Sequence, residues 1–221
     1  MLSSSDGKRN GAVVESKNTH NANNNNIRIE PLHSKHFKEV VPIVKEFFNS
    51  KHCCCCIPLG VDEGIAKYEK LQRKYPEKFA VAAVAVRVED DTVVGFAQML
   101  FENQPSYIHK CKPNEAYLEQ LCVSSDARGM GVGTKLLKWC DDLAIERNCD
   151  FIGLEVIYNN PAIRLYQRKG YTIQPKNNTS YLEKFCVTTF FCCLLGPMIC
   201  PAHSSSYCSW GLDHYMKKDL K

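Results

Sequence analysis

The stretch SSDARGMGVGTKLLKWCDDLAIE, residues 124–146, places three glycines at alternate positions directly before a helical pattern. The apolar residues of that predicted helix share one face, which we expect to pack on a core: Leu136, Leu137, Cys140, Leu143 and Ala144. Backbone N–H groups in the first turn of a helix have no partner within it and carry the positive end of its dipole. Because glycines leave such groups open to an anion, the stretch predicts a phosphate-binding turn.

Two well-known phosphate-binding motifs do not fit the stretch. A dinucleotide fingerprint needs a third glycine where Thr134 stands, and a P-loop needs Ser or Thr directly after its lysine, where Leu136 follows Lys135. A glycine turn that merely links a strand to a helix remains the alternative interpretation, because loop glycines are common. The neighbouring sequence therefore has to decide between the two.

The chain on both sides of this stretch alternates between strand and helix patterns. Alternating or apolar runs predict strands at 27–32, twice within 80–102 around a turn at 89–91, and at 115–123, 151–157, 170–175 and 213–220. Helical patterns predict further helices at 34–49 (N-cap Ser34, kink at Pro42), 62–79, and 159–170 (Pro161 in the first turn, Gly170 after the end). This order predicts one mixed α/β domain with helices on both faces of the sheet.

Composition limits the classes of function. The chain has 221 residues, 44% hydrophobic and 24% charged, which suits a soluble protein with one good core. Its net charge of +4 is mild and suits a small anionic ligand. No run of Lys or Arg and no nucleic-acid-binding motif is present, so we expect no nucleic-acid partner.

The first 26 residues are polar and rich in Ser and Asn, and we expect residues 1–26 to form a disordered tail. They contain no apolar run of the length that a secretory signal needs. Asp6 and Glu15 count against a transit peptide without excluding one. We therefore expect an intracellular, cytoplasmic protein whose thiols stay reduced.

Thirteen cysteines are unevenly distributed along the chain. Four form the run Cys53–Cys56, and others fall in an apolar insertion at about 175–210: Cys186, Cys192, Cys193, Cys200 and Cys208. Free thiols packed in hydrophobic loops, S-acylation with membrane contact, and zinc bound with help from Cys200 and His203 are the three interpretations. We favour the first and expect no metal.

Two motifs together resemble those of the GNAT (Gcn5-related) N-acetyltransferase superfamily. The first is Arg128-x-x-Gly131-x-Gly133 after the strand EAYLEQLCV, and the second is NNPAIRLYQRKGY, residues 159–171. The resemblance covers about residues 27–174 and 211–220. It implies a GNAT-type fold: a central twisted mixed sheet whose middle strands splay apart, with helices on both faces. Residues 27–221 would form one acyl-CoA N-acyltransferase domain.

The resemblance implies acetyl-CoA as co-substrate, bound in the gap between the splayed strands. The backbone of Leu121, Cys122 and Val123 would pair with the pantetheine. Asn159 would contact the pantetheine arm, and Ala162 would belong to the same CoA-contacting segment. The pyrophosphate would be held by the N–H groups of seven consecutive residues: Arg128, Gly129, Met130, Gly131, Val132, Gly133 and Thr134. Lys169 would meet the 3′-phosphate, with an ordinary surface lysine as the alternative.

The resemblance also implies direct acetyl transfer to a primary amine. Glu119 is our candidate general base, with Glu155 or water as alternatives. Alternation in an ideal strand puts Glu119 and Leu121 on one face. The N–H of Cys122 or Val123 would stabilise the oxyanion, and Tyr166 would protonate the leaving thiolate. We expect Cys122 itself to be a small buried thiol and not a nucleophile.

The acceptor stays open: a small amine or polyamine, or a protein N-terminus or lysine. The alternative function is a non-catalytic acyl-CoA-binding regulatory module, membrane-associated through its cysteine-rich segments. The presence of both Glu119 and Tyr166 favours the enzyme.

Overall fold

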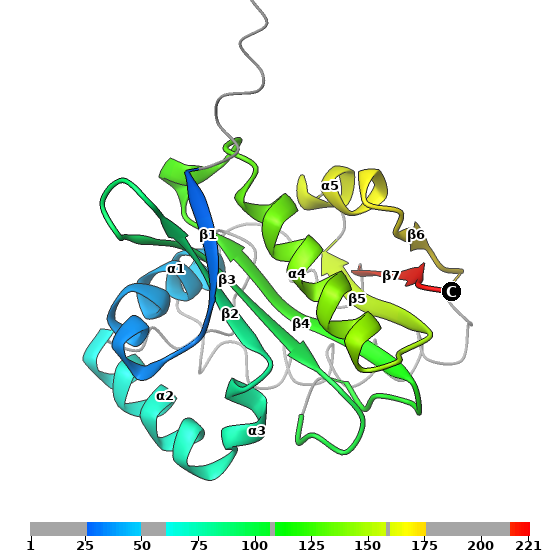
Figure 1. The fold of residues 1–221 in the computed structure, drawn as a ribbon, viewed down its shortest axis with the longest axis horizontal. Helices are drawn as coiled ribbons and strands as arrows, with labels where there is room; N and C mark the ends of the chain where they lie inside the picture. Colours follow the sequence, from blue (N-terminus) through cyan, green and yellow to red (C-terminus); the bar gives the residue numbers. More distant parts are fainter. Residues whose placement is uncertain (1–25, 50–60, 107–108, 158–159, 176–212) are drawn as a thin grey trace, which may run out of the picture.

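The computed structural model describes residues 26–49, 61–106, 109–157, 160–175 and 213–221. A seven-stranded sheet runs in the order β1 (Ile27–Pro31), β2 (Ala82–Arg87), β3 (Val93–Leu100), β4 (Glu115–Val123), β5 (Phe151–Ile157), β7 (Asp213–Asp219) and β6 (Thr172–Ile173). The helices are α1 (Phe37–Asn49), α2 (Val61–Lys74), α3 (Pro76–Phe79), α4 (Val132–Glu146) and α5 (Ala162–Arg168). The 3-10 turns η2 (Ser34–His36) and η3 (Ser125–Ala127) precede α1 and the glycine turn. This arrangement confirms the predicted mixed α/β fold (Figure 1).

The middle of the sheet opens between β4 and β5. These two strands run parallel and pair from Glu115 with Phe151 as far as Leu118 with Leu154, whereas the other described strand pairs are antiparallel. Beyond that point β4 stays paired with β3 as far as Val123, and β5 stays paired with β7 as far as Ile157. The two strands therefore separate, and the predicted splay of the middle strands is confirmed.

A β-bulge marks the start of this separation. Met99 lies opposite Leu118 and Gln98 lies opposite Gln120, so Glu119 is an extra residue in β4 without its own partner on β3. An extra residue reverses the alternation of side chains beyond it. The expectation that Glu119 and Leu121 share a face was wrong: Leu121 packs with the α4 side of the sheet, and Glu119 contacts Lys78 of α3 on the other side.

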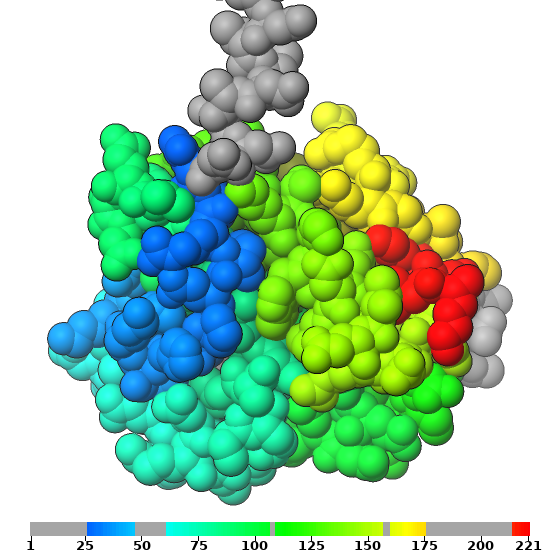
Figure 2. All heavy atoms as spheres, in the orientation of Figure 1, coloured from blue at the N-terminus to red at the C-terminus, as the bar shows by residue number. Residues whose placement is uncertain are grey.

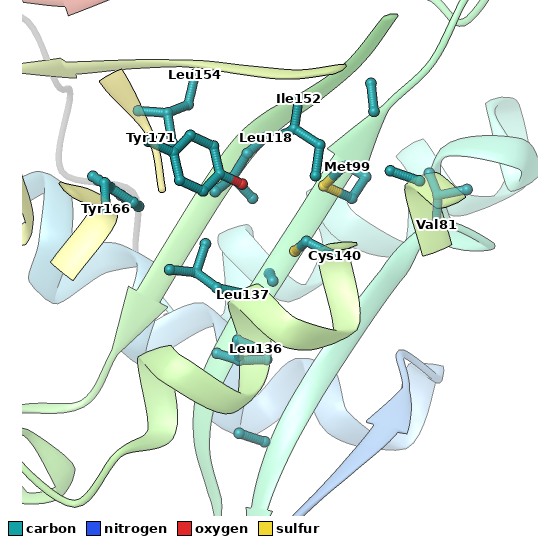
Figure 3. Packing of buried hydrophobic residues seen from close by; sticks show 14 of the residues in the cluster. Val81, Met99, Leu118, Leu136, Leu137, Cys140, Ile152, Leu154, Tyr166 and Tyr171 are labelled. Atoms are coloured by element: carbon teal, nitrogen blue, oxygen red, sulfur yellow. The ribbon is translucent and has the colours of Figure 1, made fainter. Parts of the chain in front are cut away.

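Each face of the sheet has its own apolar core. The larger core joins the sheet to α4 and α5, and it holds Leu136, Leu137 and Cys140, all fully buried, with Tyr166 and Tyr171 (Figure 3). The second core joins the opposite face to the first three helices: Phe37, Val40 and Ile43 of α1, Ile65 and Tyr68 of α2, and Phe79 of α3. The predicted coverage of both faces is confirmed.

The helix α4 crosses the sheet in front of the central strands in Figure 1. Its buried face confirms the sequence pattern, with Leu136, Leu137, Cys140 and Ala144 fully buried and Leu143 partly buried. In the space-filling view α4 and β1 lie side by side on this face (Figure 2), and Lys135 Nζ donates to the Ile27 carbonyl oxygen at 2.7 Å. The start of α4 is thus tied to the edge strand.

Two predicted helix boundaries were wrong. His33, and not Ser34, caps the first helical turn, and its backbone N–H donates to His36 Nδ1 at 3.1 Å. The helix predicted over 62–79 is two helices, because Pro76 disfavours helical geometry at Tyr75, which has φ −138° and ψ 62°. Pro42 lies inside α1, which continues past it.

Several predictions concern residues outside the described ranges. They are the disordered tail at 1–26, except for Asn26 itself, the run Cys53–Cys56, and the insertion at 175–210, except for Pro175. In the part of the chain that the structure describes, no helix is long and apolar enough to cross a membrane.

Candidate active site

The free edge of β4 faces the gap between the splayed strands. Ser124 donates its N–H to the Val94 carbonyl at 3.0 Å, so Ser124 and, by alternation, Cys122 direct their backbone groups toward β3. The backbone groups of Leu121 and Val123 therefore point to the side that β5 has left. Of the two residues predicted to supply an oxyanion N–H, this geometry favours Val123 over Cys122.

The glycine turn adopts a backbone conformation that other residues avoid. Gly129 has φ +83° and Gly131 has φ +81°, and Gly131 is the N-cap residue of α4. A Cβ at either position would meet no heavy atom within 4 Å. Both glycines are thus needed for their left-handed backbone, and the space in front of them is open.

Five backbone N–H groups in the glycine turn and the first turn of α4 are available to a ligand. Arg128 and Met130 already donate their N–H groups to the Ser125 and Ala127 carbonyls, at 3.5 and 3.3 Å. Among the described residues, no backbone acceptor serves the N–H groups of the other five: Gly129, Gly131, Val132, Gly133 and Thr134. Of the seven residues predicted to bind the pyrophosphate, these five therefore have N–H groups without a backbone acceptor among the described residues.

Gly133 has a different role from the other two glycines. A Cβ on Gly133 would lie 2.9 Å from Leu165 Cδ2, closer than side chains normally pack. Its lack of a side chain therefore lets α5 approach the first turn of α4. The two sequence motifs meet here, because Leu165 belongs to the second one.

The other predicted CoA contacts surround this turn. The Arg128 side chain is 63% exposed and donates to Glu46 Oε1 at 3.1 Å, which ties the turn to α1. Ala162 packs against the α4 core, and Lys169 follows the last residue of α5. Asn159 lies outside the described residues.

Glu119 is enclosed by partners that the sequence did not reveal. Its side chain is 6% exposed, and the Lys78 ammonium lies 2.9 Å from Oε2 and 3.1 Å from Oε1. Ser106 Oγ donates to Oε1 at 3.0 Å. These partners lie 41 and 13 residues away in sequence, and only the proline break before α3 hinted that this segment turns toward the sheet.

Tyr166 lies on the opposite face of the sheet from Glu119. It is 7% exposed in the core under α4, with its ring 5.8 Å from that of Tyr171. Burial, with Cys122 and Cys140 adding to it, raises the pKa of Tyr166 above its usual range. The phenol therefore keeps its proton, although a higher pKa also makes it a weaker acid than an ordinary tyrosine.

Cys122 is buried in the core on the α1 face of the sheet. Its thiol is 2% exposed, and burial raises its pKa to about 12. Burial is the main cause of the raised pKa of both Tyr68 and Tyr166. The Cys122 thiol adds to the rise in each case. A thiol that keeps its proton is a poor nucleophile, in line with the structural role predicted for Cys122.

The alternative base, Glu155, is exposed on β5, where it lies opposite Tyr215 of β7. It belongs to the part of β5 that has separated from β4. Glu119 is therefore the more enclosed of the two carboxylates.

A polar cluster that the sequence analysis missed lies beside the start of β4. His109, Cys111 and Glu115 each have one possible metal-ligand atom, and these atoms lie within 4.8 Å of one another. This spacing could hold a metal ion. Glu115 Oε1 is 3.0 Å from His109 Nε2 and accepts from Tyr215 Oη at 3.2 Å. Burial acts to raise the pKa of Glu115, yet these bonds and the Lys112 N–H hold it below its usual range.

The opened mixed sheet and the glycine turn before α4 are the features that the motif resemblance implies for a GNAT-type fold. A family model described as the acetyltransferase (GNAT) family matches residues 45–171, more than half of the chain. The chain therefore belongs to the GNAT family, which confirms the resemblance seen in its motifs.

Known proteins resemble the chain in part of its sequence and in most of its fold. The thialysine N-epsilon-acetyltransferase of Bos taurus is 33% identical over 60 residues, 27% of this chain and 35% of that protein. The matched stretch thus spans about a third of that relative. An N-acetyltransferase structure from Staphylococcus aureus Mu50 aligns with a TM-score of 0.59 at 19% identity, covering 89% of this chain and 99% of the other.

A Salmonella typhimurium structure, YncA, was determined with its cofactor acetyl-CoA. It aligns with a TM-score of 0.58 at 18% identity and covers 89% of this chain and 95% of its own. At these identities the two structures support the fold alone.

Proposed function

We propose that the protein is an N-acetyltransferase that moves the acetyl group of acetyl-CoA directly to a primary amine in a ternary complex. The observation that carries this proposal is the geometry of β4: a free backbone edge runs from the bulge at Glu119 into the open N–H groups that begin α4. Family membership supplies the co-substrate. The edge has two roles in this proposal: it binds acetyl-CoA, and it supplies groups for the transfer.

The chain's backbone holds acetyl-CoA. Leu121 and Val123 pair with the pantetheine amides as a further strand would, and the five open N–H groups at the start of α4 bind the pyrophosphate. Arg128 and Lys169 add positive charge near the phosphates, while Asn159 and Ala162 contact the pantetheine arm. These contacts place the thioester beside Cys122, between Glu119 and Tyr166.

The transfer then needs three groups. Glu119 accepts a proton from the acceptor's ammonium, directly or through water, and frees the lone pair that attacks the thioester carbonyl carbon. The Val123 N–H donates to the oxyanion that forms. The C–S bond breaks, and Tyr166 gives its proton to the leaving thiolate. The nitrogen loses its second proton to water, and water returns a proton to Tyr166. Glu119 and Tyr166 lie on opposite faces of the sheet, so the base and the acid reach the thioester from different sides.

The acceptor is placed at the face that α1, α2 and α3 cover. Tyr68, Phe37 and Phe79 pack together in the core there, with ring centroids 5.5 to 6.1 Å apart, and Lys78 extends from the same side to Glu119. Because the Bos taurus relative is named for thialysine, we put thialysine and lysine first among the acceptors to test, before polyamines and peptides.

The experiment is release of CoA thiol from acetyl-CoA with this panel of amines, for the wild type, Glu119→Gln and Tyr166→Phe. We expect turnover with one acceptor class and a loss of about 10²-fold or more in each variant, the usual contribution of a general acid or base. Acetyl-CoA affinity should change little in Tyr166→Phe. Bound acetyl-CoA without turnover on any amine would instead indicate the non-catalytic acyl-CoA-binding module.

A further inference from the structure

The Lys78–Glu119 pair places a lysine of the chain itself where an acceptor amine has to bind. Lys78 Nζ contacts both carboxylate oxygens of Glu119, at 2.9 and 3.1 Å. The side chains are 17% and 6% exposed, so the pair is largely shielded from water. A proton moves to a general base only across such a hydrogen-bond distance.

We propose that Lys78 is an acetyl acceptor within its own molecule, so that the enzyme acetylates itself at Lys78. The proposal rests on the proposed function, because it uses the same base and the same bound acetyl-CoA. It adds a modification site, which the function by itself does not require.

The reaction balances with the groups already present. The Lys78 ammonium loses one proton to Glu119, which passes it to water. The Lys78 nitrogen forms a bond to the acetyl carbon, the C–S bond of acetyl-CoA breaks, and the thiolate takes the proton of Tyr166. The nitrogen then loses its second proton to water, and water returns a proton to the Tyr166 phenolate, so the net products are the Lys78 amide, CoA thiol and one proton. No oxidant or further co-reactant is needed.

The surroundings of Lys78 support an internal acceptor. It belongs to α3, whose four residues carry it to the bulge where β4 leaves β5, and Phe79 beside it is fixed in the core. Ser106, which belongs to a different segment from Lys78, donates a hydrogen bond to Glu119 Oε1. Glu119 therefore keeps one hydrogen-bond partner when Lys78 becomes neutral. Acetylation turns the ammonium into a neutral amide and thereby removes the charge that balances Glu119.

The test is incubation of the full chain with acetyl-CoA and no other amine, followed by peptide mapping of each lysine for the mass of one acetyl group. Lys74, which is exposed on α2 four residues before Lys78, reports the background of uncatalysed acetylation. We expect Lys78 to be acetylated at least about tenfold faster than Lys74, at a rate that does not depend on protein concentration. Glu119→Gln and Tyr166→Phe should each remove this excess.

Three results would overturn the proposal: equal rates at Lys78 and Lys74, an unchanged Lys78 rate in both variants, or a rate that rises with protein concentration. Tyr166→Phe leaves the Lys78–Glu119 pair untouched, so it keeps the test valid if Glu119→Gln disturbs the fold. Turnover on external amines is measured in the same samples. External turnover without Lys78 acetylation refutes this inference alone, whereas loss of both refutes the proposed function as well.

Discussion

Substitutions at Gly131 separate the two reasons why a glycine begins α4. Its φ of +81° is strained for a residue with a Cβ, and the open space before it is the proposed place of the pyrophosphate. In Gly131→Ala the new methyl group clashes with nothing, so the loss of stability is the left-handed backbone strain of about 1–2 kcal/mol. For a domain of this size that lowers Tm by about 2–8 °C.

Compared with Gly131→Ala, Gly131→Asn should reduce stability less and acetyl-CoA affinity more. Asn tolerates the left-handed region, so its loss of stability should be smaller than that of Ala. Its larger side chain enters the space of the phosphate, and losing charge-assisted bonds of about 1.5–3 kcal/mol weakens acetyl-CoA binding about 10- to 100-fold. We therefore predict that stability falls in the order Gly, Asn, Ala, and affinity in the order Gly, Ala, Asn.

The assays are urea unfolding for stability and isothermal titration calorimetry for acetyl-CoA. The matched control is Asn148→Ala at the other end of the same helix, where φ is +57°. It should lose stability, though less than Gly131→Ala because the starting residue is Asn and not Gly, and it should keep its affinity. Wild-type affinity in Gly131→Asn would refute the assignment of this turn to the pyrophosphate.

Three further predictions concern stability. Leu137→Ala should lower the free energy of unfolding by about 2–5 kcal/mol, measured in urea, because this fully buried side chain fills the core under α4. Gly153→Ala should cost about 1–3 kcal/mol in the same assay, because its Cβ would collide with the Tyr215 hydroxyl, and a neutral result would contradict the packing of β7 on β5. Glu115 has a folded pKa below its usual value, so its contribution is present above the unfolded pKa of about 4.3 and is lost as pH falls through the folded value. Unfolding of wild type and Glu115→Gln from pH 7 to pH 3 should therefore show a gap that closes in acid.

The sequence was sufficient where a local pattern decides the structure. The runs EAYLEQLCV and FIGLEVI become strands with the predicted bounds, because apolar strands in the middle of a sheet need nothing beyond their own residues to be recognised. The glycines at 129 and 131 likewise predicted an open turn. The family motifs then added the splay of the middle strands, which no local pattern contains.

The sequence was insufficient where the structure depends on distant residues. The bulge at Glu119 arises from the register of β3 against β4, and it moves this side chain to the face opposite Leu121. Its partners Lys78 and Ser106 come from separate segments that tertiary packing brings together. Gly133 looked like a phosphate-turn glycine, but its lack of a side chain also serves the contact with Leu165 of α5.

In the proposed complex acetyl-CoA lies along the free edge of β4 and ends at the start of α4. Hydrogen exchange of the backbone amides, with and without acetyl-CoA, reports this position residue by residue. We expect slower exchange at Leu121 and Val123 and at the five open N–H groups of the glycine turn, with no change in β1. Protection confined to other segments, with residues 121–134 unchanged, would contradict it.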